Sequence, residues 1–152
     1  FMVSYRALKH AETVKLQLDS ETEAQIEDYL ASGEPVAIPL NKKMIDKGSA
    51  MFGLGVLNVY NETKTFQIIK QCSQIYNAGT GAPSGVSCNT PDEAMETVVE
   101  TFNLNSHESK KVAILVTPKQ VSGLHAFIIK ITCTNCQKPE YGDPQIIYVE
   151  VP

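Results

Sequence analysis

The chain has 152 residues, which is the length of a single domain with one buried core. Its 43% apolar and 20% charged residues are those of an ordinary globular protein. A net charge of −4, without a basic stripe, argues against a nucleic-acid-binding protein. No apolar run reaches the ~18 residues that a membrane-spanning helix requires, so we expect none in this sequence.

The first 32 residues have a helical pattern. In residues 1–18, apolar or small side chains recur about every 3.5 residues, but Val14, Leu16 and Leu18 also alternate as in a strand. Both structures therefore stay open for 1–18. A helix is predicted over 20–32, where Asp19 or Ser20 can cap and Glu23 completes a capping box. Its apolar stripe consists of Ile26, Tyr29 and Leu30, and Gly33 is well placed to end the helix.

From residue 36 onward the pattern favours β structure. Val36–Leu40 contains Pro39 and is predicted to be an edge strand. Met51–Tyr60 and Thr65–Cys72 flank a tight polar turn, which predicts a hairpin. Glycines 53 and 55 inside the first of these strands indicate a bulge or a close approach of another backbone.

The middle of the chain is more ambiguous. Residues 77–90 are rich in Gly, Ser, Pro and Asn and predict a long exposed loop. Thr90-Pro91-Asp92-Glu93 predicts a short helix over 91–99, whereas the β-branched residues of 97–104 favour a strand. A helical turn that leads into a strand would satisfy both patterns.

Two apolar runs dominate the C-terminal part. Val112–Thr117 and Leu124–Thr132 flank a short connection and predict adjacent strands, which are too apolar to face water without a covering layer. A turn is expected at 139–144, followed by an alternating strand over Gln145–Val151. About seven strands separated by turns predict a sandwich.

The resemblance of residues 36–152 to a known class of domain follows from short motifs. They are Glu108-Ser109 in a turn, Thr117-Pro118 after a strand, Ser122-Gly123 before the next, and Ile146–Val151 as the last strand. This pattern resembles immunoglobulin-like modules of secreted and membrane-anchored archaeal proteins. The resemblance implies a mainly β, immunoglobulin-like antiparallel sandwich at 36–152. Residues 1–35 would be an N-terminal helical stalk or assembly segment that continues a pilin-like helix.

Four cysteines are candidates for covalent or metal chemistry. Their positions favour disulfides, with Cys133 paired to Cys136 and Cys72 paired to Cys88 across the 77–90 loop, although four cysteines allow three pairings. Zinc is the alternative, since the C-x-x-C sequence supplies half of a four-cysteine site. We expect disulfides and no metal or other cofactor. Asn61-Glu62-Thr63 is an N-glycosylation acceptor pattern at a predicted turn, which makes Asn61 a candidate glycosylation site.

No catalytic motif is evident. His10, His107 and His125 are far apart, and His125 within an apolar strand is expected to be a hydrogen-bonded structural residue. We therefore expect a non-enzymatic extracellular or cell-surface protein, most simply a homo-oligomeric subunit or accessory of a pilus-like filament or envelope assembly. Residues 1–32 would bind further copies or envelope proteins. The chain begins with Phe1, so we also expect a processed or truncated chain whose membrane anchor would lie upstream.

Two other functions compete with this one. The first is a ligand- or glycan-binding sandwich that uses the 77–90 loop and its neighbours as a recognition surface. The second is an accessory domain of a larger secreted enzyme, with the chemistry elsewhere in that protein.

Overall fold

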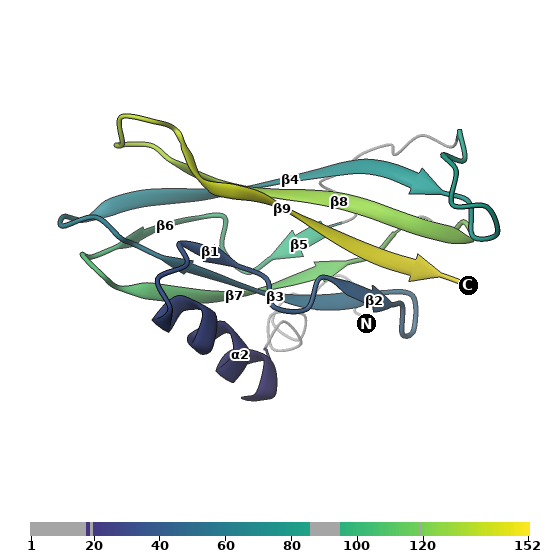
Figure 1. The fold of residues 1–152 in the computed structure, drawn as a ribbon, viewed down its shortest axis with the longest axis horizontal. Coiled ribbons are helices and arrows are strands. Elements are labelled where there is room, and N and C mark those ends of the chain that lie inside the picture. Colours follow the sequence, from purple (N-terminus) through teal and green to yellow (C-terminus); the bar gives the residue numbers. More distant parts are fainter. Residues whose placement is uncertain (1–17, 19, 86–94, 119) are drawn as a thin grey trace, which may run out of the picture.

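A computed structural model describes residue 18 and residues 20–85, 95–118 and 120–152. In this part of the chain one helix and nine strands are present, and the strands form two layers (Figure 1). The elements are α2 (Ser20–Ala31), β1 (Val36–Ala37), β2 (Lys42–Met44), β3 (Ala50–Leu57), β4 (Lys64–Tyr76), β5 (Met95–Thr97), β6 (Thr101–Leu104), β7 (Ser109–Val116), β8 (Gly123–Cys133) and β9 (Glu140–Val151). Sheet A has the order β1-β3-β7-β5 and sheet B the order β2-β9-β8-β4-β6. Apart from the parallel pair β2–β9, neighbouring strands are antiparallel, so the predicted mainly β sandwich is confirmed.

The core lies between the inner faces of the two sheets. Alternate residues of each strand enter it, as the period of a β-strand requires. In the last strand Ile147 and Val149 are buried while Ile146 is 42% exposed, which confirms the alternation predicted for 145–151. The largest fully buried side chains include Phe52 from sheet A and Phe66 and Phe127 from sheet B.

Helix α2 covers the outer face of sheet A. Figure 1 shows it below β3 and β7, on the side of that sheet away from the core. Gly53 and Gly55 face the helix, and a Cβ on Gly53 would lie only 2.5 Å from Cγ2 of Thr22. The register of β3 with β7 is unbroken, so these glycines serve the close approach of the helix and not a bulge.

The predicted helix over 20–32 is confirmed as α2, and Gly33 follows it at a φ of 99°. Its Ile26 and Leu30 are 0% and 7% exposed because they pack on sheet A of the same chain. Residues 1–32 were expected to bind further copies of the chain, but these two residues of the apolar stripe are already buried against their own chain. A helix and a strand were both considered for residues 1–18. Of these residues only Leu18 is among those that the structure describes. Among the described residues, no helix has the length and apolar character needed to cross a membrane.

The predicted pairing of the apolar runs 112–117 and 124–132 is wrong. Strand β7 lies in sheet A beside β3, whereas β8 lies in sheet B between β9 and β4. Both runs are apolar because each presents one face to the same core, and α2 also contacts β7 from outside. The segment between them therefore crosses from one sheet to the other.

The hairpin predicted from 51–60 and 65–72 is wrong for the same reason. Strand β3 belongs to sheet A and β4 to sheet B, and a buried asparagine fixes the crossing between them. The side-chain Nδ2 of Asn58 donates to the backbone carbonyls of Glu62 and Leu104, each at 2.9 Å, and its Oδ1 accepts from the backbone N–H of Tyr60. The crossing is stabilised by side-chain hydrogen bonds that take the place of strand ladder bonds.

Residues 95–104 change sheet as well. The helix predicted over 91–99 is wrong for Met95–Thr97, which form β5 in sheet A, while 91–94 lie outside the described residues. The strand alternative for 97–104 is confirmed for Thr101–Leu104, which form β6 in sheet B, but the strand is not continuous with Thr97 of β5. Lys70 reaches across this change of sheet and donates to Oγ1 of Thr97 at 3.3 Å and to the Glu100 carboxylate at 3.0 Å.

A turn and two short strands also differ from prediction. The turn expected at 139–144 lies at 134–139, and Tyr141 already pairs with Ile131 inside β9. The edge strand expected at 36–40 is limited to β1. Strand β2 was not predicted, because three polar or exposed residues carry no periodicity and their pairing with β9 is distant in sequence.

Candidate functional site

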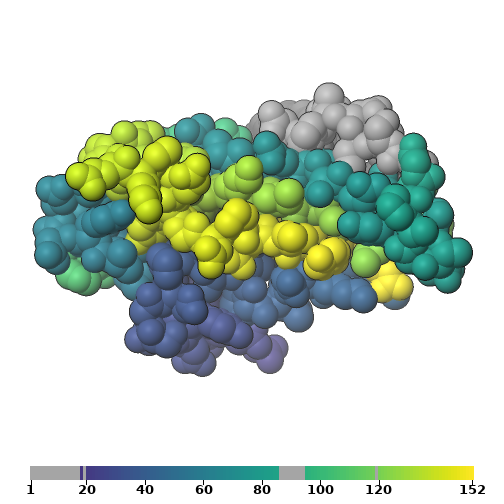
Figure 2. Space-filling view, turned by 45° about the horizontal axis from the view of Figure 1, so that its top comes forward, coloured from purple at the N-terminus to yellow at the C-terminus, as the bar shows by residue number. Residues whose placement is uncertain are grey.

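A hollow of about 380 Å³ lies on sheet B at the end where β4 and β9 finish. It crosses four neighbouring strands, because its lining comes from β2, β9, β8 and β4 in the order of the sheet. The loop after β4 adds one wall. Figure 2 shows the teal residues that end β4 and begin this loop beside the yellow end of β9. The lining residues are Lys42, Tyr76, Asn77, Ala78, Gly81, Gly123, Leu124, Tyr148 and Glu150.

The strand register brings these residues together. Tyr148 on β9 is opposite Lys42 on β2, and Leu124 on β8 is opposite Glu150 on one side and Tyr76 on the other. Side chains in such cross-strand rows share one face of a sheet. Residues from four strands that are up to about 100 positions apart in the sequence therefore line one surface.

A bulge in β4 decides that Tyr76 faces outward. The register with β8 shifts between Cys72 and Gln74, which inserts one unpaired residue. Before the shift, even-numbered residues such as Phe66 are buried, and after it the odd-numbered Ile75 is 1% exposed. Since one extra residue exchanges the two faces of a strand, Tyr76 lies on the outer face with the hollow.

Glycine fixes the floor and one wall of the hollow. Gly123 has a φ of 142°, and a Cβ there would lie 2.2 Å from the carbonyl oxygen of Tyr76. The backbones of β8 and β4 can meet this closely only at a residue without a side chain. In the wall, Gly81 has a φ of 71° and donates to the Asn77 carbonyl at 2.9 Å, and Asn77 donates to Ala82 at 2.8 Å.

Four side chains around the hollow end in polar groups. They are the ammonium of Lys42, the carboxylate of Glu150 and the phenol hydroxyls of Tyr76 and Tyr148. Within the residues that the structure describes, none of these four side chains forms a hydrogen bond or an ion pair. The hollow therefore offers donors and acceptors of both charge signs to a ligand.

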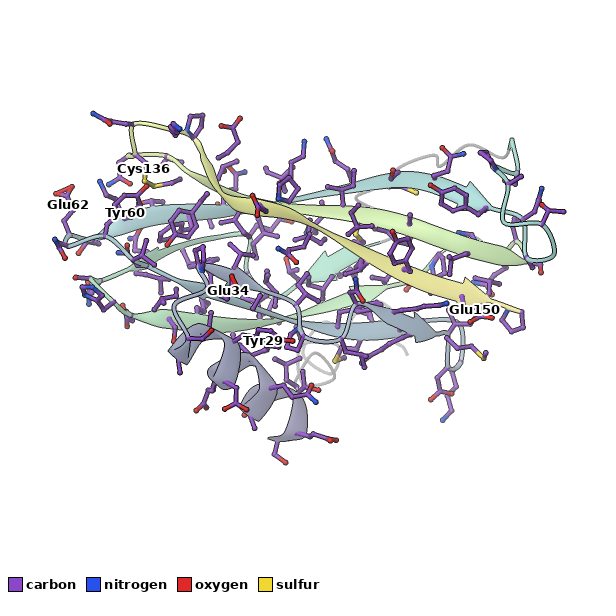
Figure 3. All side chains as sticks on the ribbon, in the orientation of Figure 1. Tyr29, Glu34, Tyr60, Glu62, Cys136 and Glu150 are labelled. Carbon is purple, nitrogen blue, oxygen red and sulfur yellow. A yellow bond between two sulfur atoms is a disulfide. The ribbon has the colours of Figure 1, made fainter. Side chains whose placement is uncertain are left out.

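The opposite end of the sandwich has a second hollow of about 460 Å³ with a different character. Figure 3 shows Tyr60, Glu62 and Cys136 at this end and Glu150 at the other. Here Lys64 donates to the Glu62 carboxylate at 2.8 Å and to the Asn135 carbonyl at 2.9 Å, and its Nζ lies 5.2 Å from the centre of the Tyr60 ring. The hydrogen bond from Lys64 and its charge lower the pKa of Glu62.

Tyr141 completes the wall of this second hollow. Its hydroxyl accepts from the Val59 amide at 3.0 Å and donates to the Leu57 carbonyl. Desolvation by burial raises the pKa of the Tyr141 hydroxyl above its ordinary value. Lys64 and Tyr141 are thus engaged by the chain itself at the ends of β3 and β4, although Gln137, Lys138 and Glu140 also line this second hollow.

The cysteines lie at two places. Cys133 and Cys136 form a disulfide with their Cα atoms 5.5 Å apart, at the end of β8. Cys72 is also disulfide-bonded, and Cys88, its expected partner, lies outside the described residues. Among the described residues, no group of three or more His, Cys, Asp or Glu side chains is placed to hold a metal ion.

The other predicted residues are structural or exposed. Asn61 is exposed in the turn between β3 and β4, and Thr63 of the same acceptor pattern donates to Asn105 Oδ1 at 3.1 Å. His125 is 1% exposed, and its Nε2 lies 2.7 Å from the Val121 carbonyl oxygen, which confirms the predicted structural histidine. His107 lies in the turn before β7 and contacts Ser106 at 2.7 Å.

The sequence indicated only part of the first hollow. The competing hypothesis of a ligand-binding module used the loop 77–90 as a recognition surface; Asn77, Ala78 and Gly81 of this loop line the hollow, while 86–90 lie outside the described residues. Lys42, Tyr76, Tyr148 and Glu150 were not predicted. The available signal was Tyr148 on the outer face of the final strand, but its neighbours depend on pairings distant in sequence.

No protein-family model matches the chain, and no curated protein sequence matches it. Among solved structures it is similar to the ASH/PapD-like domain 7 of human CEP192, with a TM-score of 0.54 and 14% identity over 78% of this chain and 85% of that domain. The chain has an immunoglobulin-like, PapD-like fold.

Two further solved structures are also similar to the chain. A family 123 glycoside hydrolase from Clostridium perfringens matches with a TM-score of 0.55 and 11% identity over 84% of this chain, which spans 25% of that enzyme. The E. coli chaperone DraB matches at 0.48 and 12% identity over 77% of this chain and 55% of the chaperone. At such identities the likeness concerns the fold alone.

Proposed function

We propose that this protein is a non-enzymatic extracellular interaction module that binds its ligand in the hollow at the end of sheet B. The observation that carries the proposal is the set of four polar groups on Lys42, Tyr76, Tyr148 and Glu150, which surround one concave surface and have no partner among the described residues. Concave surfaces with a few convergent polar groups and an apolar lining are typical of ligand sites. In the second hollow the polar groups of Lys64 and Tyr141 bind the chain itself.

The cysteines support an oxidising compartment. The disulfide between Cys133 and Cys136 joins residues at the end of β8, and Cys72 is also oxidised. Disulfides of this kind persist outside the cytoplasm, where thiols are not kept reduced. An extracellular or cell-surface location also agrees with the exposed acceptor pattern at Asn61, whose modification remains a prediction.

A fragment screen tests the proposed site without assuming a ligand. We expect small polar aromatic fragments to shift backbone amide resonances of Leu124, Tyr148 and Glu150 in two-dimensional NMR spectra. The variant Tyr148→Ala should lose these shifts. Tyr29→Ala is the matched control, because Tyr29 is 48% exposed on α2, on the other side of the sandwich. Fragment shifts that never map to the hollow, or that survive in Tyr148→Ala, would refute the site.

A second candidate function is that of a subunit or accessory of a filament or envelope assembly. It is favoured by exposed apolar residues along the β2–β9 edge of sheet B, where Leu40 is 53%, Met44 57% and Ile146 42% exposed. A native preparation should then be polymeric, and removal of residues 1–18 or the change Met44→Ser should weaken association. A strictly monomeric chain at high concentration in analytical ultracentrifugation would contradict this function.

A further inference from the structure

The ligand of the sheet B hollow can be assigned a chemical class. We propose that the hollow binds a neutral saccharide, an inference that rests on the proposed function of this same site. Three properties of the lining carry it: its balance of charge, its two tyrosines and its fixed backbone.

The lining carries one charge of each sign, which disfavours a ligand with a net charge. Lys42 contributes one positive charge and Glu150 one negative charge, and neither is paired with another described side chain. An anionic ligand attracted by Lys42 would be repelled by Glu150, and a cationic ligand attracted by Glu150 would be repelled by Lys42. Sugar hydroxyls both donate and accept, so a neutral saccharide can bind the ammonium and the carboxylate together.

The tyrosines and Leu124 match the two faces of a sugar ring. A pyranose has apolar C–H faces and a polar rim, and a tyrosine offers an apolar ring with a polar hydroxyl. Tyr76 and Tyr148 lie on either side of β8, and Leu124 lines the hollow between their strands. The volume of about 380 Å³ is within the range of small-ligand sites.

The backbone of the hollow is fixed before a ligand arrives. The bulge after Cys72 sets the direction of Tyr76, and Gly123 sets the close contact between β8 and the Tyr76 carbonyl. Tyrosine also has few rotatable bonds, so little conformational entropy is lost when a ligand orders it. Preorganisation of this kind favours weakly interacting ligands such as sugars.

The test uses an NMR titration of the full chain with neutral probes: maltose, cellobiose, lactose and N,N′-diacetylchitobiose. We expect at least one probe to give saturable shifts at Gly123, Leu124 and Tyr148. Tyr76→Ala and Tyr148→Ala should each weaken binding about tenfold, the equivalent of one aromatic contact. Tyr148→Phe should lose less, and Tyr29→Ala should leave the affinity unchanged. Thermal unfolding of each variant shows whether it is folded.

Ionic strength provides a second readout. Because a neutral ligand carries no charge to be screened, its affinity should hardly change between low and high salt. If no saccharide shifts these amides while fragments still bind the hollow, the ligand class is wrong and the proposed function stands. A ligand whose binding falls steeply with salt would also overturn the saccharide. If neither saccharides nor fragments reach the hollow, both proposals fail.

Discussion

Gly55 of β3 lies directly beneath Ile26 of α2. A Cβ at Gly55 would be 2.3 Å from Cγ2 of Ile26 and 3.2 Å from Cδ1 of Leu30. The helix can therefore rest on sheet A only where β3 has no side chain. Ala113 of β7, opposite Gly53 in the register, continues this strip of small residues. The strip and the apolar stripe of α2 together explain why the helix covers this sheet.

Gly55→Ala should lower the free energy of unfolding by about 1–3 kcal/mol, because the added methyl group overpacks the joint with Ile26. Urea denaturation measures this change. Gly79→Ala is the control, since a Cβ at Gly79 meets nothing within 4 Å. Combining Gly55→Ala with Ile26→Ala should cost less than the sum of the two single changes, because both act on one contact. Additive costs would contradict the contact.

Tyr141→Phe should destabilise the fold by about 1–3 kcal/mol, because it leaves the Val59 amide and the Leu57 carbonyl without their side-chain partner. Chemical denaturation at neutral pH measures the loss. Tyr148→Phe removes a hydroxyl that has no partner among the described residues, so it should leave stability within about 0.5 kcal/mol. Equal effects of the two changes would argue against the role of Tyr141.

The raised pKa of Tyr141 predicts a loss of stability at high pH. Burial favours the neutral phenol, so the folded chain keeps this proton above the ordinary pKa of 10.0 while the unfolded chain releases it. The stabilising contribution is complete below pH 10.0 and declines as the pH rises through the higher folded pKa. Unfolding free energies measured across this range should fall more steeply for the native chain than for Tyr141→Phe. Parallel curves would disprove the linkage.

Removal of the disulfide by Cys133→Ser with Cys136→Ser should cost about 2 kcal/mol, since a short loop restricts the unfolded chain only modestly. The fold should persist, because Asn135 still accepts from Lys64 and from the Thr65 amide within this turn. Thermal unfolding with and without a reductant measures the change. A variant that no longer folds would show that the disulfide contributes more to stability than loop closure alone explains.

Lys64→Met should return the pKa of Glu62 upward to its ordinary value of 4.5, because Lys64 is the source of the hydrogen bond and the charge that lower it. An NMR titration of the Glu62 side-chain carboxyl resonance measures the shift. Glu108→Gln, a change at the neighbouring β6–β7 turn, should leave it in place. An unchanged pKa in Lys64→Met would show that another group causes the lowering.

The local elements were readable from the sequence because their causes are local. The cap and the apolar spacing of 20–32 predicted α2, and alternation predicted β9 from Gln145 onward. The two glycines in β3 indicated a bulge or a close approach to the strand, and side chains of the helix make the close approach. Likewise, an apolar strand predicted a structural role for His125.

Strand partners and the binding surface depended on the tertiary structure. An apolar run has the same pattern whether its neighbour in sequence pairs with it or lies in the facing sheet, so the β3–β4 and β7–β8 crossings could not be distinguished from hairpins. The β3–β4 crossing is fixed by a distant contact, that of Asn58 with Leu104, and the change of sheet between β5 and β6 by that of Lys70 with Glu100.

The sequence by itself therefore determined most of the strands, helix α2 and the sandwich class of this protein. The tertiary structure decided which strands pair and that Lys42, Tyr76, Tyr148 and Glu150 surround one hollow. The physical reason is that periodicity is a property of neighbouring residues, whereas register is set by pairings distant in sequence. One bulge residue after Cys72 was enough to turn Tyr76 from the core to the hollow.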